Sequence, residues 1–145
     1  MAEDVRALSA QLAQDPQSLV FLRLAEALRR KGQLDAALDA ARQGVLADGE
    51  SGVAHLALAE VMLRMGRVKD ASEALRTASD ADPLNADVQR LRGIAAAARG
   101  DFDEAVNAWG KFLTIAPAHP EAARIRTGLE AVARLRAMVE SATNG

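Results

Sequence analysis

The sequence predicts an all-α fold, a solenoid of repeated helix–turn–helix units. Gly32, Gly66 and Gly100 are spaced 34 residues apart, and the segments that begin at them repeat in register as GQLDAALDAA, GRVKDASEAL and GDFDEAVNAW. A regular period of this length is typical of stacked pairs of helices. Alanine is abundant, which suits close packing of helices, and no run that alternates apolar and polar residues predicts a strand.

Three central repeats cover residues 18–51, 52–85 and 86–119. Each should contain two helices joined by a turn at the repeated glycine, because glycine adopts positive φ and releases the chain from a helix. With one helix before the repeats and one after them, we expect eight helices in a single domain over 1–145.

The boundaries between repeats carry residues that interrupt helices. Pro83 and Pro117 cannot donate a backbone hydrogen bond to a continuing helix. Ser51 is a suitable N-cap for the second repeat. Asp101 and Glu104 have the spacing of a capping box, which predicts the start of the last helix of the third repeat.

Both ends of the chain predict capping helices. Residues 3–14 place Val5, Leu8 and Leu12 on one helical face and are followed by Asp15-Pro16. Residues 120–140 should form a closing helix packed on the last repeat, and 141–145 should fray. Its apolar stripe consists of Ile125, Leu129, Val132, Leu135 and Val139.

Charge and composition exclude several functions. The 18 basic and 20 acidic residues are interspersed, and the arginines of the last helix are offset by glutamates. Without a basic stripe we expect no nucleic-acid binding. The absence of cysteine excludes disulfides and thiolate chemistry. Fifteen arginines against three lysines, together with the alanine content, point to a bacterial source of high GC content.

The first residues, MAEDVRALSA, are polar and acidic, unlike the start of a signal peptide, and no long apolar run predicts a membrane span. We therefore expect a cytoplasmic protein without membrane insertion. A chain from which an export signal had been removed would have the same sequence, so this alternative stays open.

No group of residues predicts an enzyme, a metal site or a cofactor. His55 and His119 are the only histidines, and neither has a second metal-ligating residue at helical spacing. Asp101, Asp103 and Glu104 lie at a helix start, where carboxylates complement the helix dipole. Trp109 is the only tryptophan, and a place in the core is favoured over stacking on a ligand. A structural role is the favoured interpretation for each of them.

The repeat resembles the tetratricopeptide repeat over roughly 18–119. That family has small residues at positions 8, 20 and 27 of each repeat, a large apolar residue at position 24 and proline at position 32. Position 8 is Ala25, Ala59 and Gly93, position 20 is Ala37, Ala71 and Ala105, and position 32 is Gly49, Pro83 and Pro117. The resemblance implies a right-handed superhelix whose concave groove holds a peptide or a helix of a partner protein.

Two residues depart from the family pattern. Phe112 stands at the small position 27, so the next helix should stand off or offer a small residue such as Gly128. Ala41 replaces the large apolar residue at position 24, where the other repeats have Leu75 and Trp109.

The resemblance also implies which residues face the groove, namely those at positions 2, 5, 9, 12 and 13 of each first helix. We expect Leu22, Leu56 and Ile94 to anchor a partner, although flanking helices could instead bury them as core. The predicted groove residues are Leu19, Leu22, Glu26, Arg29, Val53, Leu56, Glu60, Leu63, Arg64, Asp87, Arg90 and Ile94.

Some relatives grip the carboxylate at the end of a chaperone tail with lysine, asparagine and arginine. The corresponding positions here are Leu22, Glu26, Ala57, Asp87 and Leu91. None matches, and the two acids would repel a carboxylate, so we do not expect that ligand.

We therefore expect an adaptor or scaffold that binds another protein. Two alternatives remain. A terminal helix could dock on a second copy and give a homodimer, or the chain could be a chaperone that holds an export substrate.

Overall fold

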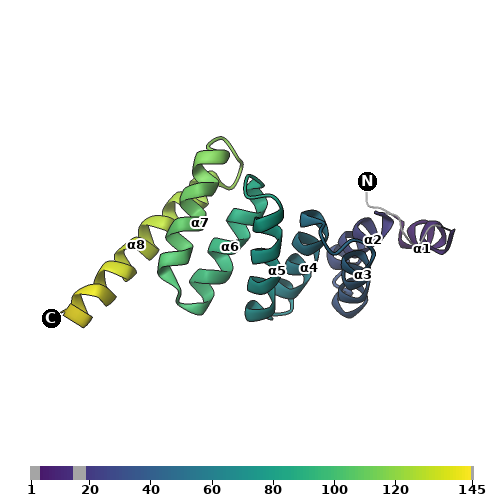
Figure 1. Ribbon diagram of the computed structural model, residues 1–145, viewed down its shortest axis with the longest axis horizontal. Helices are drawn as coiled ribbons and strands as arrows, with labels where there is room; N and C mark the ends of the chain where they lie inside the picture. The colour runs from purple at the N-terminus through teal and green to yellow at the C-terminus, as the bar shows by residue number, and fades with distance from the viewer. Residues whose placement is uncertain (1–3, 15–18, 145) are drawn as a thin grey trace. The chain divides into compact units, whose positions relative to one another are not determined.

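The computed structural model describes residues 4–14 and 19–144, and the side chains of 4–10 and 19–144. This part of the chain forms eight α-helices and no strand, which confirms the predicted fold class (Figure 1). The predicted Asp15-Pro16 turn and the side chain of Leu12 lie outside the described residues. The helices are α1 (Val5–Gln14), α2 (Val20–Arg30), α3 (Leu34–Ala47), α4 (Gly52–Arg64), α5 (Val68–Ala81), α6 (Ala86–Arg99), α7 (Phe102–Ile115) and α8 (Ala122–Asn144).

The helices group into two compact units, Met1–Ala81 and Asp82–Gly145, with the division just before Pro83. In the first unit each of the helices α1 to α4 packs against the next along the chain, and α2 also contacts α4. In the second unit α7 packs against both α6 and α8. That residues 1–145 form a single domain, wound as a right-handed superhelix, stays a prediction.

The turn inside each repeat is formed as the sequence predicts. Gly32, Gly66 and Gly100 have φ values of 77°, 79° and 79°, and no other described residue has a positive φ. This left-handed conformation is costly for residues with a Cβ atom. The 34-residue spacing of glycine therefore reflects the same turn made three times.

Side chains cap the first helices of the second and third repeats. The hydroxyl of Ser51 accepts a hydrogen bond from the backbone N–H of Ala54 at 3.1 Å, as predicted. The carboxamide oxygen of Asn85 accepts one from Val88 at 3.2 Å, a cap that the sequence analysis missed. Each cap satisfies a backbone donor at the open end of a helix.

Only half of the predicted capping box forms at the start of α7. The carboxylate of Asp101 accepts a hydrogen bond from the backbone N–H of Glu104 at 3.1 Å. The carboxylate of Glu104 points elsewhere: it pairs with the guanidinium of Arg99 and with that of Arg92 at 3.3 Å. In a capping box the carboxylate of Glu104 would accept a hydrogen bond from the backbone N–H of Asp101. Here it binds two nearby arginines instead.

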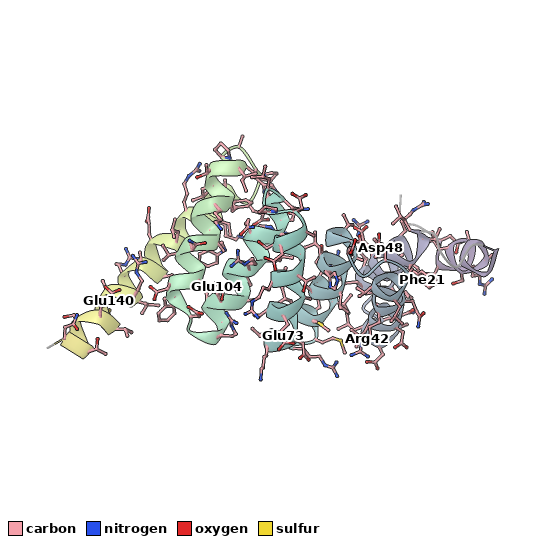
Figure 2. All side chains as sticks on the ribbon, in the orientation of Figure 1. Phe21, Arg42, Asp48, Glu73, Glu104 and Glu140 are labelled. Atoms are coloured by element: carbon pink, nitrogen blue, oxygen red, sulfur yellow. The ribbon has the colours of Figure 1, made fainter. Side chains whose placement is uncertain are left out.

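Small residues lie at the crowded positions of both units. The repeated alanines are among the least exposed residues of the chain, so helices approach closely there. Charged side chains such as Arg42, Glu73 and Glu140 lie on the exposed surface of their helices (Figure 2). The buried alanines of the repeat pattern are Ala25, Ala37, Ala59, Ala71 and Ala105.

The core of the second unit is built around Trp109 and Phe112, which are 6% and 0% exposed. The sequence analysis expects Gly128 to face Phe112, and this expectation is wrong, because Gly128 faces Trp109. A Cβ atom at position 128 would lie 3.3 Å from the six-membered ring of Trp109, so Gly128 makes room for Trp109. Phe112 instead meets the ring of His119 edge to face, at 5.1 Å between centroids.

Helix α8 differs from its prediction at the carboxyl end. It continues to Asn144, about one turn beyond the predicted end. Ile125 and Val132 are buried as expected, whereas Leu135 and Val139 are 44% and 53% exposed. The apolar stripe of α8 is thus packed in its first half and open in its second.

Candidate functional site

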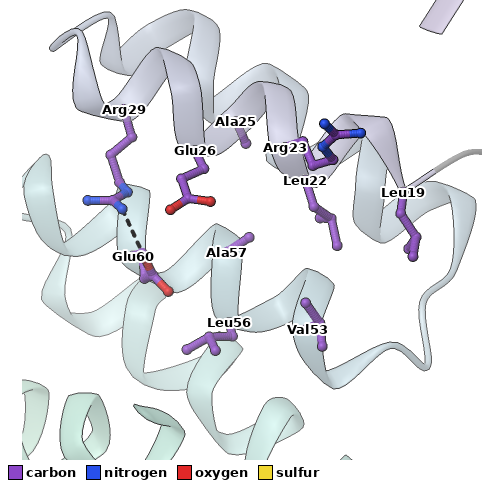
Figure 3. A pocket seen from close by; sticks show the side chains of 10 residues that line it. All are labelled: Leu19, Leu22, Arg23, Ala25, Glu26, Arg29, Val53, Leu56, Ala57 and Glu60. Carbon is purple, nitrogen blue, oxygen red and sulfur yellow. Dashed lines mark ion pairs between the residues drawn. The ribbon is translucent and has the colours of Figure 1, made fainter. Parts of the chain in front are cut away.

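A pocket of about 370 Å³ lies between α2 and α4 in the first unit (Figure 3). Both helices contribute side chains along their length, and α2 and α4 run in the same direction. Leu19 and Val53 lie at the amino-terminal end of the pocket, and Arg29 and Glu60 lie at the other. The lining residues are Leu19, Leu22, Arg23, Ala25, Glu26, Arg29, Val53, Leu56, Ala57 and Glu60.

Seven of the twelve predicted groove residues line this pocket, all of them from the first two repeats. The sequence analysis did not assign Arg23, Ala25 and Ala57 to the groove. Arg23 and Ala57 share position 6 of their repeats, so the alignment of the repeats contained the signal that would have found both. Ala25 was assigned only to helix packing.

One end of the pocket is apolar and open. The side chains of Leu19 and Val53 are 69% and 57% exposed. Leu56, one turn after Val53 on α4, also lines the pocket but is only 9% exposed, so most of its surface is already packed in the fold. Exposed aliphatic side chains beside a concavity are typical of a surface that binds an apolar group.

Leu22 serves both the pocket and the core. It is half-buried and lines the pocket. A Cβ atom added to Gly44 on α3 would lie 2.7 Å from Cδ2 of Leu22, so the leucine is packed tightly onto that glycine. A charge at position 22 would therefore disturb the fold as well as the pocket.

The other end of the pocket is charged. The guanidinium of Arg29 pairs with the carboxylate of Glu60 across the two helices at 3.4 Å (Figure 3). Glu26 pairs with Arg30 on its own helix at 2.7 Å. The Glu26 and Glu60 side chains remain 52% and 34% exposed, so both carboxylates can accept further hydrogen bonds.

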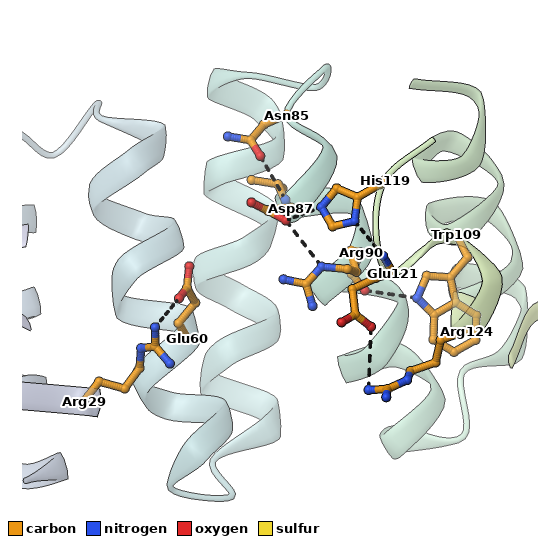
Figure 4. Close-up of polar contacts among 10 residues, drawn as sticks. Arg29, Glu60, Asn85, Asp87, Arg90, Trp109, His119, Glu121 and Arg124 are labelled. Atoms are coloured by element: carbon orange, nitrogen blue, oxygen red, sulfur yellow. Dashed lines mark hydrogen bonds and ion pairs between the residues drawn. The ribbon is translucent and has the colours of Figure 1, made fainter. Parts of the chain in front are cut away.

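The remaining predicted groove residues lie outside this pocket. Leu63 and Arg64 are near the carboxyl end of α4. In the second unit, Asp87 pairs with Arg90 at 3.3 Å (Figure 4). Ile94 is 38% exposed. The first helix of the third repeat therefore presents the ion pair of Asp87 and Arg90 beside the partly exposed Ile94.

Both histidines make structural contacts. The Nε2 atom of His55 lies 2.9 Å from the carbonyl oxygen of Gly49. The Nδ1 atom of His119 accepts a hydrogen bond from the backbone N–H of Glu121 at 3.0 Å, which places the proton of the neutral ring on Nε2. Nε2 faces the carboxylate of Asp87 at 3.6 Å (Figure 4).

Across the described residues, no three acidic, histidine or cysteine side chains are grouped to hold a metal ion. Among the helices described, none has the length and apolar character needed to cross a membrane.

The family model for the tetratricopeptide repeat matches residues 28–94, from the end of α2 into α6. No curated protein sequence matches the chain significantly.

Several solved structures share the fold. A crystal structure of MamA protein is 21% identical with a TM-score of 0.80, covering 97% of this chain and 75% of that one. The second tetratricopeptide repeat domain of human RPAP3, in complex with an HSP70 peptide, is 19% identical with a TM-score of 0.71. The match covers 80% of this chain and 94% of that one. The Yersinia enterocolitica type III secretion translocator chaperone SycD is 17% identical with a TM-score of 0.74, covering 88% and 87%. The family model thus identifies residues 28–94 as tetratricopeptide repeat sequence, and the solved structures share the all-α fold of the chain.

Proposed function

We propose that the chain is a protein-interaction adaptor that binds a segment of a partner protein in the pocket between α2 and α4. The general role is supported by the family, whose members are interaction modules, and by the peptide bound to the second RPAP3 domain. The observation that carries the proposal is the pair of open aliphatic side chains, Leu19 and Val53, at the mouth of the pocket.

The apolar end of the pocket supplies the binding free energy in this proposal. Fully burying an aliphatic side chain of this size contributes roughly 1.5–3 kcal/mol relative to leaving it in water. Leu19 and Val53 each have more than half of their surface to bury. An apolar face of a partner helix, or alternate side chains of an extended peptide, would cover both.

The charged end restricts the choice of partner. Glu26 and Glu60 present two partly exposed carboxylates, which favour a basic side chain on the partner and disfavour a terminal carboxylate. Ala57, at another position that some relatives use to grip a carboxylate, offers no hydrogen-bond donor from its side chain. The proposed ligand is thus an internal segment with apolar residues and a neighbouring lysine or arginine.

A substitution at Val53 tests the proposal without disturbing the core. Val53→Asp places a charge at the mouth of the pocket, in the first turn of α4, where aspartate suits the helix dipole. Leu46→Asp is the matched control, because Leu46 is 77% exposed in the same unit and does not line the pocket. Both variants should retain the circular dichroism of the wild type, and Leu46→Asp, near the carboxyl end of α3, should lower the free energy of unfolding by at most about 1 kcal/mol.

The readout is quantitative co-purification of partners from the source cells, followed by titration of the purified partner. The proposal predicts that Val53→Asp weakens binding at least about ten-fold while Leu46→Asp leaves it unchanged, since about 1.4 kcal/mol corresponds to a factor of ten. Equal binding by all three proteins would show that the partner uses another surface.

A further inference from the structure

The carboxyl-terminal end of α8 is a helical segment whose apolar face is open. Among the described residues after Val132, none on this helix is buried. Leu135, Met138 and Val139 are 44%, 66% and 53% exposed, and their spacing of three and four residues places them on one face. The segment from 133 to 144 therefore carries an exposed apolar stripe that spans little more than one of its three turns.

Such a segment gains little stability by itself. A helix of about twelve residues is marginal in water, and most helical stability in proteins comes from packing an apolar face. Here the first half of α8 packs on Trp109 and Phe112, but the second half extends past them. Within the second unit the stripe is left uncovered, as a docking surface would be.

The pocket between α2 and α4 matches this segment in size and character. The pocket runs along α2 from Leu19 to Arg29, about 16 Å at 1.5 Å per residue, and the free segment of α8 is about 18 Å long. Both have an apolar part of two or three large aliphatic side chains next to a charged part. We infer that the end of α8 from a second copy of this chain binds in the pocket.

The charged end of the pocket, where Glu26 and Glu60 each pair with an arginine, favours one direction of binding. Arg134 and Arg136 lie at the start of the free segment, on either side of the apolar stripe. Glu26 and Glu60 lie at the end of the pocket away from Leu19. Pairing the arginines with these carboxylates places Met138 and Val139 over the apolar end, so the incoming helix runs antiparallel to α2. Arg136 is 38% exposed and pairs with Asp103 at 3.8 Å, so it can exchange partners at small cost.

This contact joins different surfaces of the two copies, the pocket of one and the helix end of the other. Such a contact leaves one pocket and one helix end unused in a dimer, and further copies can add. The inference rests on the proposed function, because it uses the same pocket. It adds that self-association and partner binding compete.

Analytical ultracentrifugation of the full chain and two variants tests the inference. Met138→Asp disables the helix end and leaves the pocket intact, whereas Val53→Asp disables the pocket and leaves the helix end intact. Each variant alone should be monomeric, with self-association at least about ten-fold weaker than that of the wild type. An equimolar mixture should form a one-to-one complex, because one functional pocket and one functional helix end remain.

Two controls keep the test specific. Ala137→Asp lies on the face of α8 opposite the stripe and Leu46→Asp lies outside the pocket, so both should associate as the wild type does. A wild type that is monomeric at every concentration, variants that still associate, or a mixture that stays monomeric would each overturn the inference. A different result would contradict the proposed function: the Val53→Asp variant would still capture the partner protein, whatever its self-association. Met138→Asp should capture that partner at least as well as the wild type, because its pocket is no longer contested.

Discussion

The indole of Trp109 lies directly against the backbone of Gly93, so that a Cβ atom at position 93 would be 2.1 Å from Nε1. The same Nε1 atom donates a hydrogen bond to the carbonyl of Arg90 at 3.0 Å, one turn earlier on α6 (Figure 4). Helix α6 can accept the ring only because residue 93 has no side chain. This explains why glycine stands where the first two repeats have alanine.

Gly93→Ala should therefore destabilise the second unit although alanine favours helices. Displacing the indole from its contact and hydrogen bond should lower the free energy of unfolding by about 3 kcal/mol. Gly110→Ala on α7 is the control, because nothing lies within 4 Å of a Cβ atom there. That variant should be more stable by up to about 1 kcal/mol. Urea titration followed by Trp109 fluorescence measures both, and equal stability of the two variants would contradict the packing argument.

Gly100→Ala measures how much the positive φ of the turn contributes to the free energy of unfolding. No atom lies within 4 Å of a Cβ atom at this position, so only the positive φ of 79° opposes the substitution. The expected loss is about 1–2 kcal/mol in the free energy of unfolding. Gly100→Asn should lose less, because asparagine tolerates this conformation better. Chemical denaturation of both variants compares them, and an equal loss would point to a steric cause instead.

Gln89 is a buried polar side chain of α6 that links the turn at Pro83 to Arg92 on the same helix. It is 0% exposed, donates to the carbonyl of Pro83 at 3.1 Å and accepts from Arg92 at 3.0 Å. Gln89→Leu would leave both partners without these bonds and should cost about 1–3 kcal/mol. Asn107→Leu, at an exposed position of α7, should change stability little. Thermal unfolding of both variants is the measurement, and a neutral Gln89→Leu would show that water replaces the lost bonds.

The two side-chain caps allow the units to be followed separately. Asn85→Ala and Ser51→Ala should each cost about 1 kcal/mol, because each removes the acceptor for a backbone N–H. Trp109 is the only tryptophan and lies in the second unit, so its fluorescence reports on that unit directly. Asn85→Ala should shift the fluorescence transition at least as much as the circular dichroism transition. If Ser51→Ala shifts the fluorescence transition equally, the two units unfold together.

The helices could be predicted from the sequence because their signals are local. The 34-residue glycine period gives the turns, and Pro83, Pro117 and Ser51 mark boundaries that need no knowledge of distant contacts. The partner of Gly128 could not be predicted in this way. The choice between Trp109 and Phe112 depends on the angle at which α8 crosses α7, which a repeat pattern does not specify.

The candidate site was predictable in part for a similar reason. Repeat positions identify which side chains of α2 and α4 face the same side, and most of the pocket follows from them. They do not show that Leu22 is tightly packed on Gly44, because that contact depends on the spacing between α2 and α3. They also do not show that Leu135 and Val139 are left open, since this depends on how far α7 extends beside α8.

Site-specific photocrosslinking from Val53 tests the central proposal most directly. Replacing Val53 with benzoyl-phenylalanine places the reactive group at the open mouth of the pocket, and the same replacement of Leu46 provides the control. Irradiation in the source cells followed by peptide sequencing identifies the occupant. We predict crosslinks from position 53, and not from position 46, to one apolar segment of a partner protein and to α8 of a second copy. No crosslink from position 53, or the same crosslinks from both positions, would contradict binding in the pocket between α2 and α4.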